Sequence, residues 1–111
     1  MIHVYGIKAC DTCRKALKWL DSEGRDYRWQ DIREEPLDAS LLAQWLERLG
    51  PEALVNRRST TWRGLTEAER TRASDDAIGL LQAHPTLIKR PVFQRDDAIW
   101  VGFNDSVRGE L

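Results

Sequence analysis

The feature that most constrains the fold is a pair of cysteines spaced C-x-x-C near the start of the chain, Cys10 and Cys13. An apolar, β-prone segment precedes them at residues 2–7. After them, apolar residues recur at i, i+3, i+4 and i+7 over residues 11–23, which is the spacing of one helical face. We therefore expect a strand, a turn that carries Cys10, and a helix that ends at Gly24.

A cysteine at this turn would lie where backbone N–H groups and the dipole of the following helix stabilise a thiolate. Lys8, Arg14 and Lys15 add positive charge close by in the sequence. Both effects predict a lowered pKa for Cys10 and a nucleophilic thiolate near pH 7. Cys13, one helical turn further on, would then attack a mixed disulfide on Cys10 and release the bound group.

The alternatives for this pair are two buried structural thiols or half of a zinc site. A four-ligand zinc site needs two more ligands. Only His3 and His84 remain to supply them, and neither has a companion at ligand spacing. We therefore expect no metal and favour a redox or nucleophilic role, since the motif lies in a β-α-β context.

The composition excludes several other classes of protein. A chain of 111 residues is expected to form one domain, and its 17 Lys and Arg against 18 Asp and Glu give a net charge of −1. That balance gives no electrostatic case for nucleic acid as the main partner. The sequence shows neither a membrane-spanning apolar run nor a signal-peptide pattern, so we expect a cytoplasmic chain with mostly reduced cysteines.

The order of elements predicts the fold class. A second strand is expected at residues 26–32, parallel to the first because a helical crossover joins them. Helical patterns fill about residues 37–84, and two strands around a turn at residues 95–97 lead to a last short helix. The order β-α-β, helical insert, β-β-α predicts an α/β, thioredoxin-like fold with a mixed sheet, formed as a single domain over residues 1–111.

Three separated stretches carry a family resemblance. Residues 5–20 begin Y-G-I-K and continue through C-D-T to R-K-A and W-L; residues 56–65 read N-x-R-x-T-T-W-R-x-L; residues 85–91 read P-x-L-I-K-R-P, with V-G-F following at 101–103. Together they resemble the ArsC/Spx family in the right order and over essentially the whole chain. The resemblance is strongest to its YffB-type branch, ArsC-related proteins thought to be glutathione-dependent thiol reductases.

The resemblance implies roles for particular residues. Cys10 matches the cysteine that attacks arsenate in the family's arsenate reductases. Arg90 and Pro91 match an arginine that lines the oxyanion site and the cis-proline that follows it. A guanidinium there would clamp a tetrahedral anion or a glutathione carboxylate, whereas the alternative for Arg90 is a solvated arginine at a strand edge.

Three further residues are candidates for substrate or anion binding. Lys8 lies two residues before Cys10, where it would stabilise a thiolate or a glutathione carboxylate. Thr12 is placed to donate a hydrogen bond to the cysteine sulfur. Arg58 lies in a basic loop beside Asn56, near which another arginine of the family's site falls. For Lys8 and Arg58 the alternative is an ordinary solvated side chain.

Three functions remain open. The first is a glutathione-dependent thiol or disulfide reductase without a bound cofactor, in which Cys10 attacks and Cys13 or glutathione resolves; glutaredoxin is a further candidate partner. The second is a redox regulator like Spx, which would bind RNA polymerase and sense oxidation through the cysteine pair. The third is an arsenate reductase, against which Gly102 stands where the family has an arginine. We favour the first.

Overall fold

The computed structural model describes all residues, 1–111, and the chain divides into two compact units. The first unit combines residues 1–35 with residues 90–111, and it contains both cysteines. The second unit, residues 36–89, contains the helices expected as an insert at about residues 37–84. The organisation as a single domain stays a prediction.

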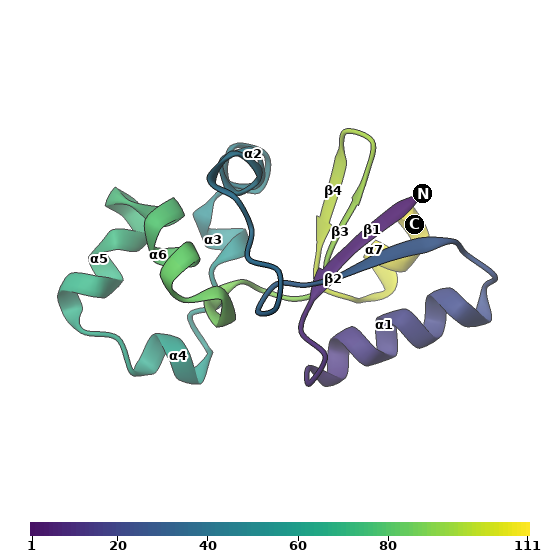
Figure 1. Ribbon diagram of the computed structural model, residues 1–111, viewed down its shortest axis with the longest axis horizontal. Coiled ribbons are helices and arrows are strands. Elements are labelled where there is room, and N and C mark those ends of the chain that lie inside the picture. The colour runs from purple at the N-terminus through teal and green to yellow at the C-terminus, as the bar shows by residue number, and fades with distance from the viewer. The chain divides into compact units, whose positions relative to one another are not determined.

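The first unit is built on a four-stranded sheet in the order β2-β1-β3-β4 (Figure 1). Its strands are β1 (Ile2–Gly6), β2 (Tyr27–Asp31), β3 (Val92–Arg95) and β4 (Ala98–Val101). The helix α1 (Asp11–Ser22) joins β1 to β2, which are parallel, while β3 is antiparallel to both β1 and β4. The sheet is therefore mixed, and the α/β, thioredoxin-like fold expected from the sequence is confirmed.

Two helices cover the same face of this sheet, because one cluster of buried side chains joins them to it. Side chains alternate along a strand, so Ile2 and Val4 of β1 point to one face. They pack with residues of α1, β3 and the C-terminal helix α7 (Asp105–Glu110). The remaining members of the cluster are Ala16, Leu20, Phe93, Val107 and Leu111. Because α1 packs on β1, the first turn of α1 lies close to the C-terminal end of β1, and Cys10 lies between the two.

The ends of α1 follow the signals in the sequence. Cys10 is the residue before the helix, with extended backbone angles of φ −80° and ψ 119°. After the helix, Gly24 has φ 64°, a left-handed conformation that glycine adopts without a steric penalty. The predicted turn at Cys10 and the predicted end at Gly24 are both confirmed.

The second unit consists of short helices: α2 (Ala39–Leu49), α3 (Pro51–Leu54), α4 (Thr60–Arg63), α5 (Glu67–Asp75), α6 (Ala77–Ala83) and the 3₁₀ helix η1 (Pro85–Leu87). Asp38 caps α2 by accepting a hydrogen bond from the Leu41 N–H at 2.8 Å. Thr66 and Glu69 form a capping box at α5. No helix of the chain is both long enough and apolar enough to cross a membrane.

Candidate active site

Cys10 lies in the turn between β1 and α1, at the position that precedes the first helical residue. Its backbone N–H donates to the Ile7 carbonyl at 3.0 Å, which closes the turn, and its own carbonyl accepts the Arg14 N–H at 3.1 Å. The thiol is free and the residue is half-buried. Cys10 therefore combines a defined backbone position with access from solvent.

Arg14 has a different role from the one that the sequence suggested. Its Nε donates to the Lys8 carbonyl at 3.2 Å, and an Nη donates to the Ala9 carbonyl at 3.1 Å. The guanidinium therefore ties the first turn of α1 to the loop before Cys10. Its hydrogen bonds hold the backbone that leads to Cys10.

Cys13 lies beneath Cys10, on the buried side of α1, and only 1% of its surface is exposed. Burial, together with the charge and hydrogen bonding of Cys10, raises the pKa of the Cys13 thiol to about 12. The sulfur lies against Gly6: a Cβ added to Gly6 would lie 2.5 Å from Cys13 Sγ and 2.9 Å from the Trp29 ring. Cys13 is therefore a protonated thiol at neutral pH.

The pKa of Cys10 moves in the opposite direction. Burial by itself raises it, but hydrogen bonds from the Cys13 backbone and thiol, and from the Arg90 guanidinium, outweigh burial and hold the pKa below its ordinary value. The expected lowering of the Cys10 pKa is therefore found, although Cys13 and Arg90 make the main contributions where the sequence suggested Lys8, Arg14 and Lys15. The pair consists of a half-buried thiol whose pKa is lowered and a buried thiol whose pKa is raised.

Arg90 and Pro91 lead into β3, and the peptide bond between them is cis, as the resemblance implied. Pro91 is buried, and its carbonyl accepts the Gly102 N–H at 2.8 Å. Arg90 is half-buried, and its guanidinium acts on Cys10 both by hydrogen bonding and by charge. The structure thus brings together Cys10, Cys13, Arg90 and Pro91 of the predicted site.

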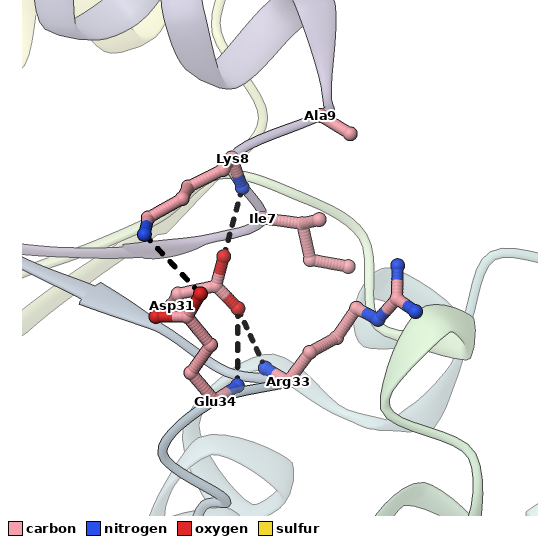
Figure 2. A pocket seen from close by; sticks show the side chains of 6 residues that line it. All are labelled: Ile7, Lys8, Ala9, Asp31, Arg33 and Glu34. Atoms are coloured by element: carbon pink, nitrogen blue, oxygen red, sulfur yellow. Dashed lines mark hydrogen bonds and ion pairs between the residues drawn. The ribbon is translucent and has the colours of Figure 1, made fainter.

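A hollow of about 370 Å³ borders the loop that leads to Cys10 (Figure 2). It is lined by Ile7, Lys8, Ala9, Asp31, Arg33 and Glu34. Lys8 Nζ pairs with Glu34 Oε1 at 3.2 Å, and both side chains are more than half exposed (68% and 63%). Any acidic group that binds Lys8 must therefore compete with Glu34, and because the pair is exposed it contributes little to stability.

The positions of the other predicted site residues do not indicate a role in binding. Thr12 is the second residue of α1 and is exposed. Arg58 belongs to the second unit, where its backbone N–H donates to Asn56 Oδ1 at 3.1 Å. Substrate roles for Lys8, Thr12 and Arg58 stay predictions. No group of three or more His, Cys, Asp or Glu side chains is arranged to hold a metal ion.

Two residues at the site were not singled out from the sequence. Asp31 ends β2 and is buried beside the hollow, and Gly6 ends β1 against Cys13. An aspartate at the end of a strand and a glycine before a turn are common in sequences, so neither carries a signal by itself. Their importance comes from partners that the fold supplies.

Comparison with known proteins shows the family. The model of the ArsC family matches residues 5–110, so the chain belongs to the ArsC family. A solved structure of a protein named YFFB is 36% identical, with a TM-score of 0.91 over 99% of this chain and 97% of that one. An arsenate reductase-related protein from Brucella melitensis is 40% identical, with a TM-score of 0.79 over 98% of this chain and 92% of that one.

The chain is also similar to regulators. The global transcriptional regulator Spx of Bacillus subtilis is 27% identical over 107 residues, which cover 95% of this chain and 82% of the relative. The expected membership of the ArsC/Spx family is therefore confirmed. The fold is that of the arsenate reductase-related thiol oxidoreductases, and it is shared with a regulator.

Proposed function

We propose that the protein is a thiol–disulfide oxidoreductase that takes its reducing equivalents from glutathione. The observation that carries this proposal is the opposite pKa shifts of its two cysteines. Cys10 is half-exposed with a lowered pKa, whereas Cys13 is buried with its pKa raised to about 12. A nucleophilic thiolate at the surface and a protonated thiol beneath it suit a two-step thiol exchange.

In the first step, the Cys10 thiolate attacks the glutathione sulfur of a mixed disulfide between glutathione and a substrate thiol. A sulfur–sulfur bond forms between Cys10 and glutathione, and the substrate's disulfide bond breaks. The substrate leaves as a thiolate, which takes a proton from water. Arg90 supports this step, because its guanidinium stabilises the attacking thiolate and offers a fork-shaped donor to a carboxylate of glutathione.

In the second step, either of two thiols regenerates Cys10. A second glutathione thiolate can attack the glutathione sulfur, which releases oxidised glutathione and the Cys10 thiolate. Alternatively, Cys13 loses its proton and attacks Cys10 Sγ, which releases glutathione and leaves a Cys10–Cys13 disulfide for glutathione or glutaredoxin to reduce. Cys10 in a disulfide carries no negative charge, so one cause of the high pKa of Cys13 is removed.

The direct test is turnover of a glutathione mixed disulfide by the purified, reduced protein, followed as NADPH consumption with glutathione and glutathione reductase. The proposal places this reaction in the cytoplasm, where glutathione keeps thiols reduced. We expect turnover by the wild-type protein and none by Cys10→Ser. Equal rates for the two proteins would refute the role of Cys10, and the absence of turnover by the wild-type protein would refute the proposed activity.

The similarity to Spx supports a second candidate function, a redox-sensing regulator that binds RNA polymerase. A pull-down with the polymerase α subunit separates the two functions. Capture that depends on the redox state of Cys10 and Cys13, without turnover, would favour the regulator.

Arsenate reduction is the third candidate, and the same coupled assay tests it with arsenate as the substrate. Gly102 has φ 83°. An arginine, which the resemblance places at this position in arsenate reductases, would be strained in that conformation. We therefore expect turnover of the mixed disulfide without turnover of arsenate.

A further inference from the structure

Asp31 is the one buried residue whose side chain carries a charge, and 6% of its surface is exposed. Its carboxylate accepts three backbone hydrogen bonds. Oδ2 accepts the Lys8 N–H at 2.9 Å, and Oδ1 accepts the N–H groups of Arg33 at 2.8 Å and Glu34 at 3.2 Å. A buried carboxylate without hydrogen-bond partners would strongly destabilise the fold. The three donors around Asp31 provide those partners.

These hydrogen bonds join two segments that are far apart in the sequence. Lys8 belongs to the loop that leads to Cys10, and it lies 23 residues before Asp31. Arg33 and Glu34 belong to the segment after β2, on the other side of the hollow (Figure 2). The Asp31 side chain therefore connects the loop before Cys10 to the segment that forms the opposite wall of the hollow.

We propose that Asp31 is a positioning residue for the Cys10 thiolate, acting through the backbone of the loop at residues 7–9. The loop has two anchors: the Arg14 guanidinium binds the carbonyls of Lys8 and Ala9, and the Asp31 carboxylate binds the Lys8 N–H. With both anchors in place, Cys10 Sγ is held where the donors from Cys13 and Arg90 reach it. Loss of the Asp31 anchor frees one side of the loop and weakens those contacts.

The role requires an anion with two acceptor oxygens. In Asp31→Asn, the remaining oxygen can keep the N–H groups of Arg33 and Glu34, but the new amide NH₂ then faces the Lys8 N–H, and donor meets donor. The opposite orientation of the amide would lose two hydrogen bonds instead of one. The isosteric variant is therefore expected to release the loop before Cys10 selectively, while leaving the segment after β2 in place.

The ionisation of Asp31 agrees with this geometry. Burial by itself raises the pKa of Asp31, but the three backbone donors and the charge of Lys8 outweigh burial and hold the pKa below its ordinary value. Asp31 is consequently an anion throughout the pH range in which Cys10 titrates. Removal of this negative charge would by itself favour the Cys10 thiolate and lower its pKa, so a rise in the pKa of Cys10 on mutation of Asp31 reports the loss of the anchor.

The test measures the rate at which iodoacetamide alkylates Cys10 as a function of pH, with the modified cysteine assigned by peptide mass spectrometry. For Asp31→Asn we expect the titration of Cys10 to move to higher pH and the alkylation rate at pH 7 to fall by about threefold or more, which corresponds to a shift of about half a pKa unit. The matched control is Asp38→Asn, which also removes a carboxylate that accepts a backbone N–H, but at the start of α2. We expect the control to keep the wild-type profile.

Asp31→Glu keeps the anion on a longer side chain, and we expect it to restore part of the wild-type profile. A wild-type Cys10 profile in a folded Asp31→Asn protein would overturn the proposal. Because that variant could fail to fold, amide hydrogen exchange on the wild-type protein provides a second test. We expect the Lys8 N–H to be protected, and exchange as fast as in an unstructured peptide would overturn the proposal as well.

This inference deepens the proposed function, because it concerns the nucleophile on which that function rests. Alkylation requires neither glutathione nor a disulfide substrate. A protein that fails the turnover assay can still show the Asp31 dependence of Cys10, and a protein that passes it can lack that dependence. The two failures are therefore distinguishable.

Discussion

The sulfur of Cys13 occupies the space that a side chain on Gly6 would fill, since a Cβ there would lie 2.5 Å from Cys13 Sγ. No real contact between these atom types is that short, so the buried thiol and the absent side chain depend on one another. Gly6 also ends β1, one loop before Cys10. The absence of a side chain at the end of β1 therefore leaves the space that the Cys13 thiol fills.

Gly6→Ala should displace Cys13 or the Trp29 ring and destabilise the first unit. Overpacking of a well-packed site typically costs about 1–3 kcal/mol, and we expect a loss of that size in the free energy of unfolding. Urea unfolding of the reduced protein measures it. Gly109→Ala is the matched control, because a Cβ at Gly109 has no other atom within 4 Å. Equal stability of Gly6→Ala and the wild-type protein would contradict the contact.

Cys13→Ala should raise the pKa of Cys10, because the thiol and backbone of Cys13 supply hydrogen bonds that lower it and the variant removes the thiol. A higher pKa leaves less thiolate at neutral pH, so the alkylation profile of Cys10 should move to higher pH. Cys13→Ser, whose hydroxyl can still donate, should shift it less. Identical profiles for all three proteins would show that the thiol does not support the thiolate.

The same Cys13→Ala variant separates the two routes for resolution. If glutathione alone can resolve the mixed disulfide on Cys10, the variant should retain turnover in the coupled assay. If Cys13 is required, turnover should be lost while one glutathione remains bound to Cys10. Mass spectrometry of the protein after a single turnover measures which species accumulates.

Arg90→Ala should affect both the nucleophile and substrate binding. Loss of the guanidinium removes a hydrogen bond and a positive charge that lower the pKa of Cys10, so thiolate formation should require higher pH. We expect a rise in KM for the glutathione mixed disulfide together with a fall in kcat/KM of about tenfold or more, typical of a lost charge-assisted contact. Lys18→Ala, on the exposed side of α1, is the control for a lost positive charge. Unchanged kinetics for Arg90→Ala would contradict a role of Arg90 in substrate binding and in lowering the pKa of Cys10.

Asp31→Asn should reduce stability at neutral pH and much less so in acid. A group whose pKa is lower in the folded state stabilises the protein above its unfolded pKa, and this contribution is lost as the pH falls through the folded value. Asp31 has such a lowered pKa. We expect the variant to be less stable by about 2 kcal/mol at pH 7, with the difference shrinking below about pH 4. Urea unfolding across this range measures the difference, and a gap that is constant down to about pH 2 would contradict it.

The parts of the fold that follow local rules could be predicted from the sequence. Cys10 precedes α1, Gly24 follows it, and the pair Thr66 and Glu69 caps α5, because each depends on residues within one helical turn. The parallel pairing of β1 with β2 followed from the length of the crossover between them. The mixed sheet followed from the order of the elements, whereas the strand order β2-β1-β3-β4 was not predicted and comes from the structure.

The details of the candidate site could be predicted only in part. The placement of Cys10 before α1 and of Arg90 before the cis-proline could be predicted, because each residue belongs to a short motif. The role of Asp31 could not be predicted, because its partner is the backbone N–H of Lys8. Every residue except proline has a backbone N–H, so the sequence does not show which one will bind a carboxylate. Arg14 was assigned to the electrostatics of the thiolate for a related reason: its acceptors are the carbonyls of a loop whose path only the structure shows.

The attachment of Arg14 to the carbonyls of Lys8 and Ala9 has a consequence for substrate selection under the proposed function. Two hydrogen bonds join the loop before Cys10 to the first turn of the helix after it, and they limit how far Cys10 can shift. A cysteine held in this way does not adapt its position to different molecules. If the protein acts as proposed, selection among substrates comes from the groups that surround the sulfur, and a substrate must bring its disulfide to Cys10 at an angle that the protein sets in advance.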